Sequence, residues 1–306
     1  LCVTAILVLF LRTRGSVLLR SPGTSVIALL TLGGALVSMA PIGRYAGFGA
    51  GQLLCGIVVA LFGVTLRYRF TQIGEPLTKS PRLTLLLTTT FCVFFILASA
   101  TSLLVFGGKP MYADTQAILA QAHLFAQGFI KGSAAQSYAP VGFIVHHNNE
   151  WFSIYSPGHP ALLALGVLAG NLEWMVNPLL GASSVTLMTA IAAKRYGFIA
   201  SLFTALLATT SPWILLLSAE YLNHGSTLFF FSLALFGITT WSTSRNGRSA
   251  AVVALGCFGV LITRPYTGLA LSLPFLVFLL FERARRAHLT IISAGIGLGF
   301  AVLLAH

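Results

Sequence analysis

The chain consists of long, uncharged apolar runs separated by short polar segments. Most of the runs reach the roughly 17–25 residues that a membrane-spanning helix needs. The predicted spans are about 1–11, 25–43, 45–66, 83–106, 174–193, 196–219, 225–244, 249–263, 265–281 and 289–305. A further run, 161–170, is too short to cross and predicts a half-helix in or on the outer leaflet. We therefore predict an all-α polytopic membrane protein with about ten transmembrane helices.

The composition supports this class and excludes others. Of the 306 residues, 57% are hydrophobic and only 8% are charged, against roughly 25% charged in soluble domains. A water-soluble surface cannot be built from so few charges. The formal net charge is +12, but the basic residues lie in short clusters between apolar runs. A nucleic-acid-binding face is therefore not expected.

The basic clusters predict the orientation in the membrane. They are Arg12, Arg14 and Arg20; Arg67, Arg69, Lys79 and Arg82; Lys194 and Arg195; Arg245 and Arg248; Arg283, Arg285 and Arg286. If 161–170 does not cross, all of them fall on one side, which the positive-inside rule assigns to the cytoplasm. Most acids and histidines then fall outside. We expect a multi-pass protein of the bacterial cytoplasmic membrane, with its chemistry facing the periplasm or exterior.

The external side includes a long stretch, 107–173, that does not span. Within it, Tyr112 to Lys131 is predicted to form an amphipathic helix lying in the membrane interface. Its apolar positions are Ile118, Ala122, Phe125 and Phe129. Residues 143–155 predict a hairpin that turns at Asn148-Asn149.

Two units are expected along the chain. Residues 1–81 would hold N-terminal transmembrane helices of unassigned role, and 82–306 would form a transmembrane core. Because the first residue is Leu and the apolar run 289–305 ends abruptly, we expect a fragment of a larger protein that continues past His306.

Asp114 and Arg264 are the strongest candidates for chemistry. Asp114 is the only Asp in the chain and follows the outer end of a predicted span, where a carboxylate can act as a general base. The alternative is a helix N-terminal charge. Arg264 lies outside against the positive-inside trend, and its planar fork suits a lipid phosphate. Snorkelling, or pairing with Glu220 or Asp114, is the alternative.

Two polar segments add further candidates. In Tyr155-Ser156-Pro157-Gly158-His159-Pro160, the prolines and glycine would hold His159 at the membrane surface, able to donate to a phosphate or a sugar hydroxyl. In the segment 218–224, the side chains of Glu220, Tyr221 and His224 are expected to face a cavity. The alternatives are an exposed turn for the first segment and an ordinary polar loop for the second. No metal site is predicted; the alternative is a site formed by His146-His147 with Glu150.

These segments, in their order, resemble the GT-C superfamily of membrane glycosyltransferases. The similarity is to bacterial relatives of protein O-mannosyltransferases and lipid A aminoarabinose transferases, and it covers roughly 83–281. The matching segments are Tyr112-Ala113-Asp114-Thr115-Gln116, Ala126-Gln127-Gly128, Trp151 to Pro160, Asn177-Pro178-Leu179-Leu180-Gly181, Ser211-Pro212, Asn223-His224 and Leu261-Ile262-Thr263-Arg264-Pro265.

The resemblance implies a fold with a large first external loop and an external active site. The donor would be a polyprenyl-phosphate sugar, and the acceptor a glycolipid, glycan or protein hydroxyl. Asp114 matches the family's catalytic acid. Arg264 matches the cation that binds the lipid phosphate, with His159, His224, Tyr155, Tyr221 and Glu220 as weaker candidates. No cofactor is indicated, since many relatives carry a second acid where this chain has Thr115.

Two other classes stay open at this point. A transporter or lipid flippase would place broken helices and charges near the middle of the membrane, whereas the polar residues here gather at one face. A non-catalytic subunit that keeps the GT-C fold is also compatible with the missing second acid.

Overall fold

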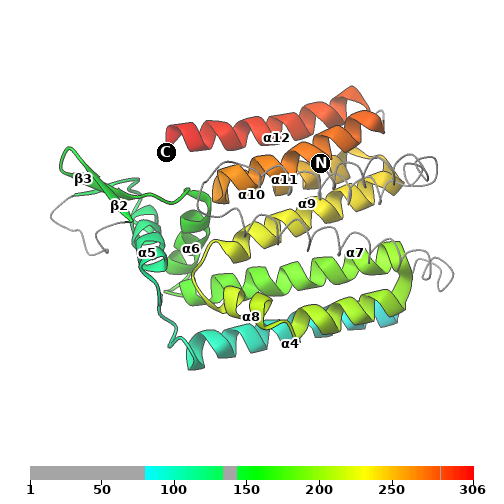
Figure 1. Ribbon diagram of the computed structural model, residues 1–306, viewed down its shortest axis with the longest axis horizontal. Helices are drawn as coiled ribbons and strands as arrows, with labels where there is room; N and C mark the ends of the chain where they lie inside the picture. The colour runs from blue at the N-terminus through cyan, green and yellow to red at the C-terminus, as the bar shows by residue number, and fades with distance from the viewer. Residues whose placement is uncertain (1–79, 134–142, 283) are drawn as a thin grey trace, which may run out of the picture.

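The computed structural model describes residues 80–133, 143–282 and 284–306, which form a helical bundle with a small sheet at one end (Figure 1). The predicted spans 1–11, 25–43 and 45–66 lie outside the described residues. The helices are α4 (Pro81–Leu104), α5 (Ala113–Ala126), α6 (Gly158–Leu168), α7 (Glu173–Thr209), α8 (Pro212–Ala219), α9 (His224–Ser244), α10 (Gly247–Thr263), α11 (Pro265–Phe281) and α12 (Arg286–Ala305). The strands are β1 (Gly132–Ser133), β2 (Ile144–His147) and β3 (Glu150–Ser153).

Apolar helices form the bundle, as the hydrophobic runs predict. Among the described residues, α4, α7, α9 and α12 are long and apolar enough to cross a membrane. α10 and α11 have 17 residues each, or about 25 Å of helix. On α4, large apolar side chains face outward, with Leu85, Ile96 and Leu104 at 68%, 63% and 85% exposed. Such a surface suits lipid rather than water.

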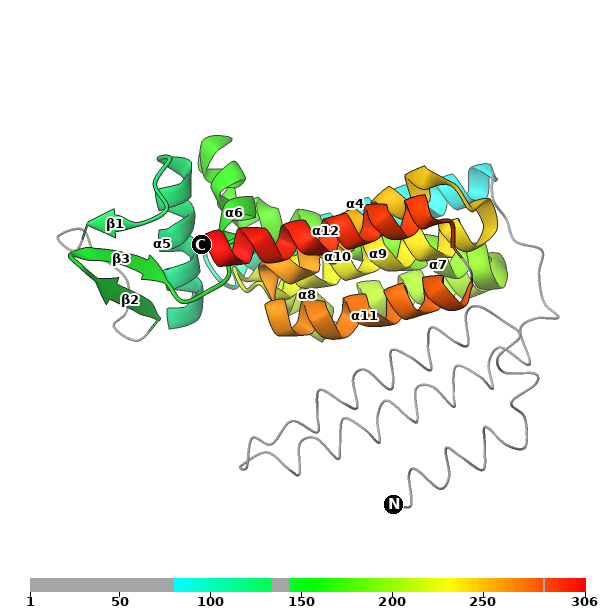
Figure 2. The same cartoon turned by 90° about the horizontal axis from the view of Figure 1, so that it is seen from above.

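The two ends of the bundle differ. Helices α5 and α6 and the sheet lie together at one end, which we call the sheet end (Figures 1 and 2). The opposite end, here the basic end, holds the bend within α7 and the α9–α10 and α11–α12 connections. Lys194 and Arg195 precede the bend in α7, and Arg245, Arg248 and Arg285 lie in or beside the two connections. The described basic clusters therefore share one end of the bundle, as the sequence predicts.

The predicted span 196–219 is wrong as a single helix. α7 continues past its first crossing, bends at Gly197 (φ 86°) and folds back (Figure 1). The returning helix ends at Thr209, and α8 starts anew with Pro212. Proline suits the first turn of a helix because its missing N–H has no partner there, and the Ser211 hydroxyl accepts from the Ile214 N–H at 3.4 Å.

α9 and α10 approach each other closely, and this contact positions the site. A Cβ on Gly256 would lie 2.5 Å from the backbone nitrogen of Ala234, and one on Gly259 only 2.1 Å from the Phe230 ring. Only glycine permits this approach. It fixes the start of α9 beside the end of α10, at the sheet end.

The sheet end is built from a hairpin packed on α5. Asn148 (φ 50°) and Asn149 (φ 61°) form the two-residue turn between β2 and β3, and both take the left-handed conformation that a type I′ turn requires. The predicted hairpin is confirmed. The fully buried Gln121 amide joins α5 to it, donating to Ile130 O at 2.7 Å and accepting from Ser153 N at 2.8 Å.

α5 is shorter than predicted. It ends at Ala126, and Gly128 turns the chain with φ 84°. Ile118 and Ala122 are buried as expected, but Phe129 lies beyond the helix and is 59% exposed. The predicted apolar stripe therefore stops before Phe129.

Candidate functional site

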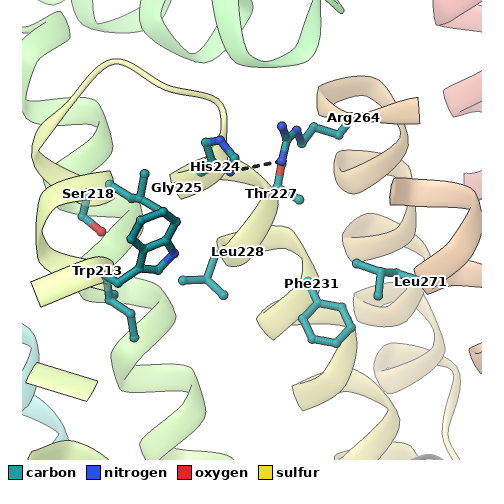
Figure 3. Close-up of a pocket in the computed structure, with 11 residues that line it drawn as sticks. Trp213, Ser218, His224, Gly225, Thr227, Leu228, Phe231, Arg264 and Leu271 are labelled. Carbon is teal, nitrogen blue, oxygen red and sulfur yellow. Dashed lines mark hydrogen bonds between the residues drawn. The ribbon is translucent and has the colours of Figure 1, made fainter. Parts of the chain in front are cut away.

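Arg264 and His224 come together at the sheet end. α10 must end at Arg264, because Pro265 follows and begins α11. His224 is the first residue of α9. The two side chains point toward each other, with Arg264 NH1 3.0 Å from His224 Nδ1 (Figure 3). Since a guanidinium can only donate, Nδ1 is the acceptor and the neutral ring carries its proton on Nε2.

A cavity of about 290 Å³ extends from this pair between α8, α9 and α11. Its lining is mostly apolar, with Thr227 near the pair and Ser218 on α8 as the other polar side chains (Figure 3). The lining residues are Trp213, Ile214, Leu217, Ser218, His224, Gly225, Thr227, Leu228, Phe231, Arg264 and Leu271. Trp213 is 71% exposed, so α8 contributes a side chain that belongs both to the cavity and to the outer face of the bundle.

The polar end of the cavity favours an anion. α9 begins at His224 and α11 at Pro265, and the first turn of a helix leaves N–H groups without intrahelical acceptors. The helix dipole places partial positive charge at the same point. Burial lowers the pKa of Arg264, but an arginine stays protonated in proteins. The C-terminus of α10 ends at the same point and offsets the start of α11, so the positive charge here comes from Arg264 and the start of α9.

Asp114 lies in the first turn of α5 and has Tyr155 as its neighbour. Burial raises the pKa of Tyr155, and the hydrogen bond to Asp114 and the charge of that carboxylate raise it further. Tyr155 thus stays a neutral donor beside Asp114. Neither residue lines the cavity, so the structure pairs these two candidates with each other rather than with Arg264.

Glu220 has a different role from the predicted one. Its carboxylate is buried and accepts hydrogen bonds from the Met111 N–H at 2.7 Å, the Thr115 hydroxyl at 3.5 Å and the Tyr221 N–H. It therefore joins the α8–α9 loop to the segment just before α5 and places a negative charge near the N-terminus of that helix. We correct the prediction that it binds substrate, because it is buried, does not line the cavity and accepts from protein donors.

Tyr221 is corrected in the same way. Its side chain is 3% exposed, and its hydroxyl donates to Gly108 O at 2.8 Å. Burial raises its pKa, and the charges of Glu173 and Glu220 add to the effect. Tyr221 connects the α8–α9 loop to the segment before α5, so its role is to stabilise the structure around the site.

His159 is buried inside the protein and is not accessible as the predicted donor. Its side chain is 0% exposed, and Nε2 lies 2.8 Å from Tyr221 O. Because a carbonyl only accepts, Nε2 carries the proton. Burial lowers the pKa of His159 to about 4, although the bond to Tyr221 opposes the shift.

Acid is expected to destabilise the protein through His159. Between the ordinary pKa of 6.5 and the folded pKa of about 4, the unfolded chain binds the proton and the folded one does not, so stability falls as pH falls through this window. At pH 5 the loss is about 2 kcal/mol. We expect a larger drop in melting temperature from pH 7 to 5 for the wild type than for His159→Gln. Equal drops would contradict the assignment.

Asn177 is a residue of the site that sequence reasoning missed. Its buried amide donates to the carbonyls of Glu220 and Leu222, the latter at 2.9 Å, and so holds the α8–α9 loop against α7. An Asn before a Pro within an apolar run was the available signal. With His159, it fixes the loop that leads into His224.

The sequence comparisons do not assign the chain to a family. No protein-family model matches it, and neither a curated protein nor a solved structure matches it. Within the described residues, no three His, Cys, Asp or Glu side chains are grouped to hold a metal. The geometry of the sheet end is therefore the basis for a function.

Proposed function

We propose that this protein is a membrane glycosyltransferase of the GT-C type, which takes its sugar from a polyprenyl-phosphate donor. Transfer to an acceptor hydroxyl would occur at the sheet end, on the external face of the membrane. One observation carries the proposal: Arg264 and His224 lie at one end of a mostly apolar cavity that reaches the outer surface of the bundle at Trp213.

This arrangement matches the chemistry of a lipid phosphate. A phosphate needs a fork of donors and local positive charge, which Arg264 and the start of α9 supply. An isoprenyl chain needs an apolar channel, which Leu228, Phe231 and Leu271 supply below them. A cavity of about 290 Å³ is too small for a whole polyprenyl chain, so most of the chain would remain in the bilayer.

Asp114 would act on the acceptor. In the transfer, the acceptor oxygen attacks the anomeric carbon, and the bond from that carbon to the phosphate oxygen breaks. Asp114 takes the acceptor proton. The phosphate leaves with the bonding electron pair, and Arg264 stabilises its growing negative charge. The GT-C resemblance leads us to expect inversion at the anomeric carbon.

The test is a comparison of two lipids that differ only in the phosphate. Purified protein in detergent is titrated with decaprenyl phosphate and with decaprenol, and tryptophan fluorescence reports binding because Trp213 lines the cavity. We expect the phosphate to bind at least tenfold tighter, since a hydrogen-bonded charge contributes about 1.5–3 kcal/mol. Equal binding of the two lipids would overturn the proposal.

A further inference from the structure

Two cations of α7 reach across to α9 at the basic end of the bundle. Lys194 Nζ donates to the Thr240 hydroxyl at 2.8 Å, and Arg195 NH2 donates to the Ser242 hydroxyl at 2.6 Å. All four residues are partly exposed. The two helices pack along each other (Figure 1), so the hydroxyls hold both cations in fixed positions where α7 meets α9.

The surroundings of Lys194 supply no negative charge among the described residues. Its ammonium is bonded to a neutral hydroxyl and lies 5.1 Å from the centre of the Phe236 ring. The charge of Arg195 acts on it with the same sign. Glu282 is the only carboxylate described at the basic end, and it pairs with Arg245. A partly desolvated cation beside a like charge is costly unless an anion accompanies it, so Lys194 indicates a place for an anion.

The level of Lys194 in the membrane favours a lipid phosphate. The residue follows directly on the apolar run 174–193, and phospholipid headgroups begin where the apolar run ends. An ammonium has three donors, of which Thr240 uses one. Next along α7, Tyr196 and Ile199 are 36% and 46% exposed, and such side chains are typical of the level where headgroups meet acyl chains. Basic residues between transmembrane helices bind anionic headgroups in this way.

We infer that Lys194, with Arg195 beside it, binds the phosphate of an anionic phospholipid in the leaflet that meets the basic end. This site lies at the opposite end of the bundle from Arg264, so it does not rest on the proposed function. Phosphatidylglycerol fits the site, because its headgroup carries a phosphate and no cation. Phosphatidylcholine fits poorly, because its choline would approach two positive charges.

The experiment compares Lys194→Gln with Arg286→Gln as its matched control. Glutamine at 194 keeps a donor for Thr240, and Arg286 is an exposed cation at the start of α12, at the same end of the bundle. The purified chain in detergent is titrated with phosphatidylglycerol or phosphatidylcholine, with inorganic phosphate as a competitor, and bound lipid is measured by native mass spectrometry. In the wild type and in Arg286→Gln, phosphatidylglycerol should bind about fivefold tighter than phosphatidylcholine. Lys194→Gln should lose that preference, and Lys194→Arg, which restores the charge, should keep it.

Four outcomes would overturn the inference. If the wild type binds the two lipids equally, the surface holds acyl chains without recognising the headgroup. If Arg286→Gln loses as much preference as Lys194→Gln, the attraction belongs to the whole basic end. If inorganic phosphate displaces phosphatidylglycerol at equal concentration, the site takes the free anion rather than the lipid. If Arg264→Gln removes the preference, phosphatidylglycerol binds in the cavity at the sheet end instead.

Discussion

Asp114→Asn is expected to lower sugar transfer by about 10²- to 10⁴-fold, which is the usual contribution of a positioned general base. The amide keeps the size of the side chain but cannot take the acceptor proton. Donor binding should change less than twofold, because Asp114 does not line the cavity. The measurement is the rate at which membranes carrying each variant consume radiolabelled decaprenyl-phosphate mannose.

The matched control for Asp114 is Glu150→Gln, which also removes one carboxylate at the sheet end. Glu150 is exposed, and its ion pair with Lys131 at 3.0 Å is solvent-accessible, so its loss should cost little. The control should keep the wild-type rate. A fully active Asp114→Asn protein would exclude Asp114 as the base, and an inactive Glu150→Gln protein would show that the assay reports loss of any acid.

The sequence predicts the elements whose signals are local. An uncharged run of spanning length is sufficient for α4, α9 and α12, because a helix satisfies its own backbone groups within lipid. The hairpin is predicted from Asn148-Asn149, since asparagine tolerates the positive φ that the turn needs. The break before Pro212 is not predicted, because an averaged hydropathy is the same for one helix and for two apolar helices in succession.

The site is harder to predict because its partners are far apart in sequence. The sequence offers Glu220 and Asp114 as partners for Arg264, but Arg264 pairs with His224, 40 residues away. Glu220 reaches Met111 across 109 residues, and nothing in either local segment signals that contact. Burial of His159 likewise depends on α6 packing against α5 and α7, which no pattern within its own segment expresses.

Arg264→Gln is expected to weaken decaprenyl phosphate binding by about 10- to 100-fold. Hydrogen bonds to a charged group contribute about 1.5–3 kcal/mol, and each 1.4 kcal/mol corresponds to about tenfold in affinity. Glutamine keeps a donor near His224 but removes the charge and the fork. The affinity of Arg264→Lys should lie between those of the wild type and Arg264→Gln, because lysine restores the charge without the paired donors that match a phosphate.

Arg248→Gln provides the matched control for Arg264→Gln. Arg248 is exposed at the start of α10, at the basic end of the bundle, so removing it takes away the same charge far from the cavity. If general attraction between a basic protein and an anionic lipid caused the binding, both variants would weaken it equally. If Arg264 holds the phosphate, only Arg264→Gln weakens lipid binding. Added salt should then reduce wild-type binding less than it would reduce binding by exposed charges, because buried groups are screened less. Equal losses of affinity in the two variants would contradict the placement of the phosphate beside Arg264.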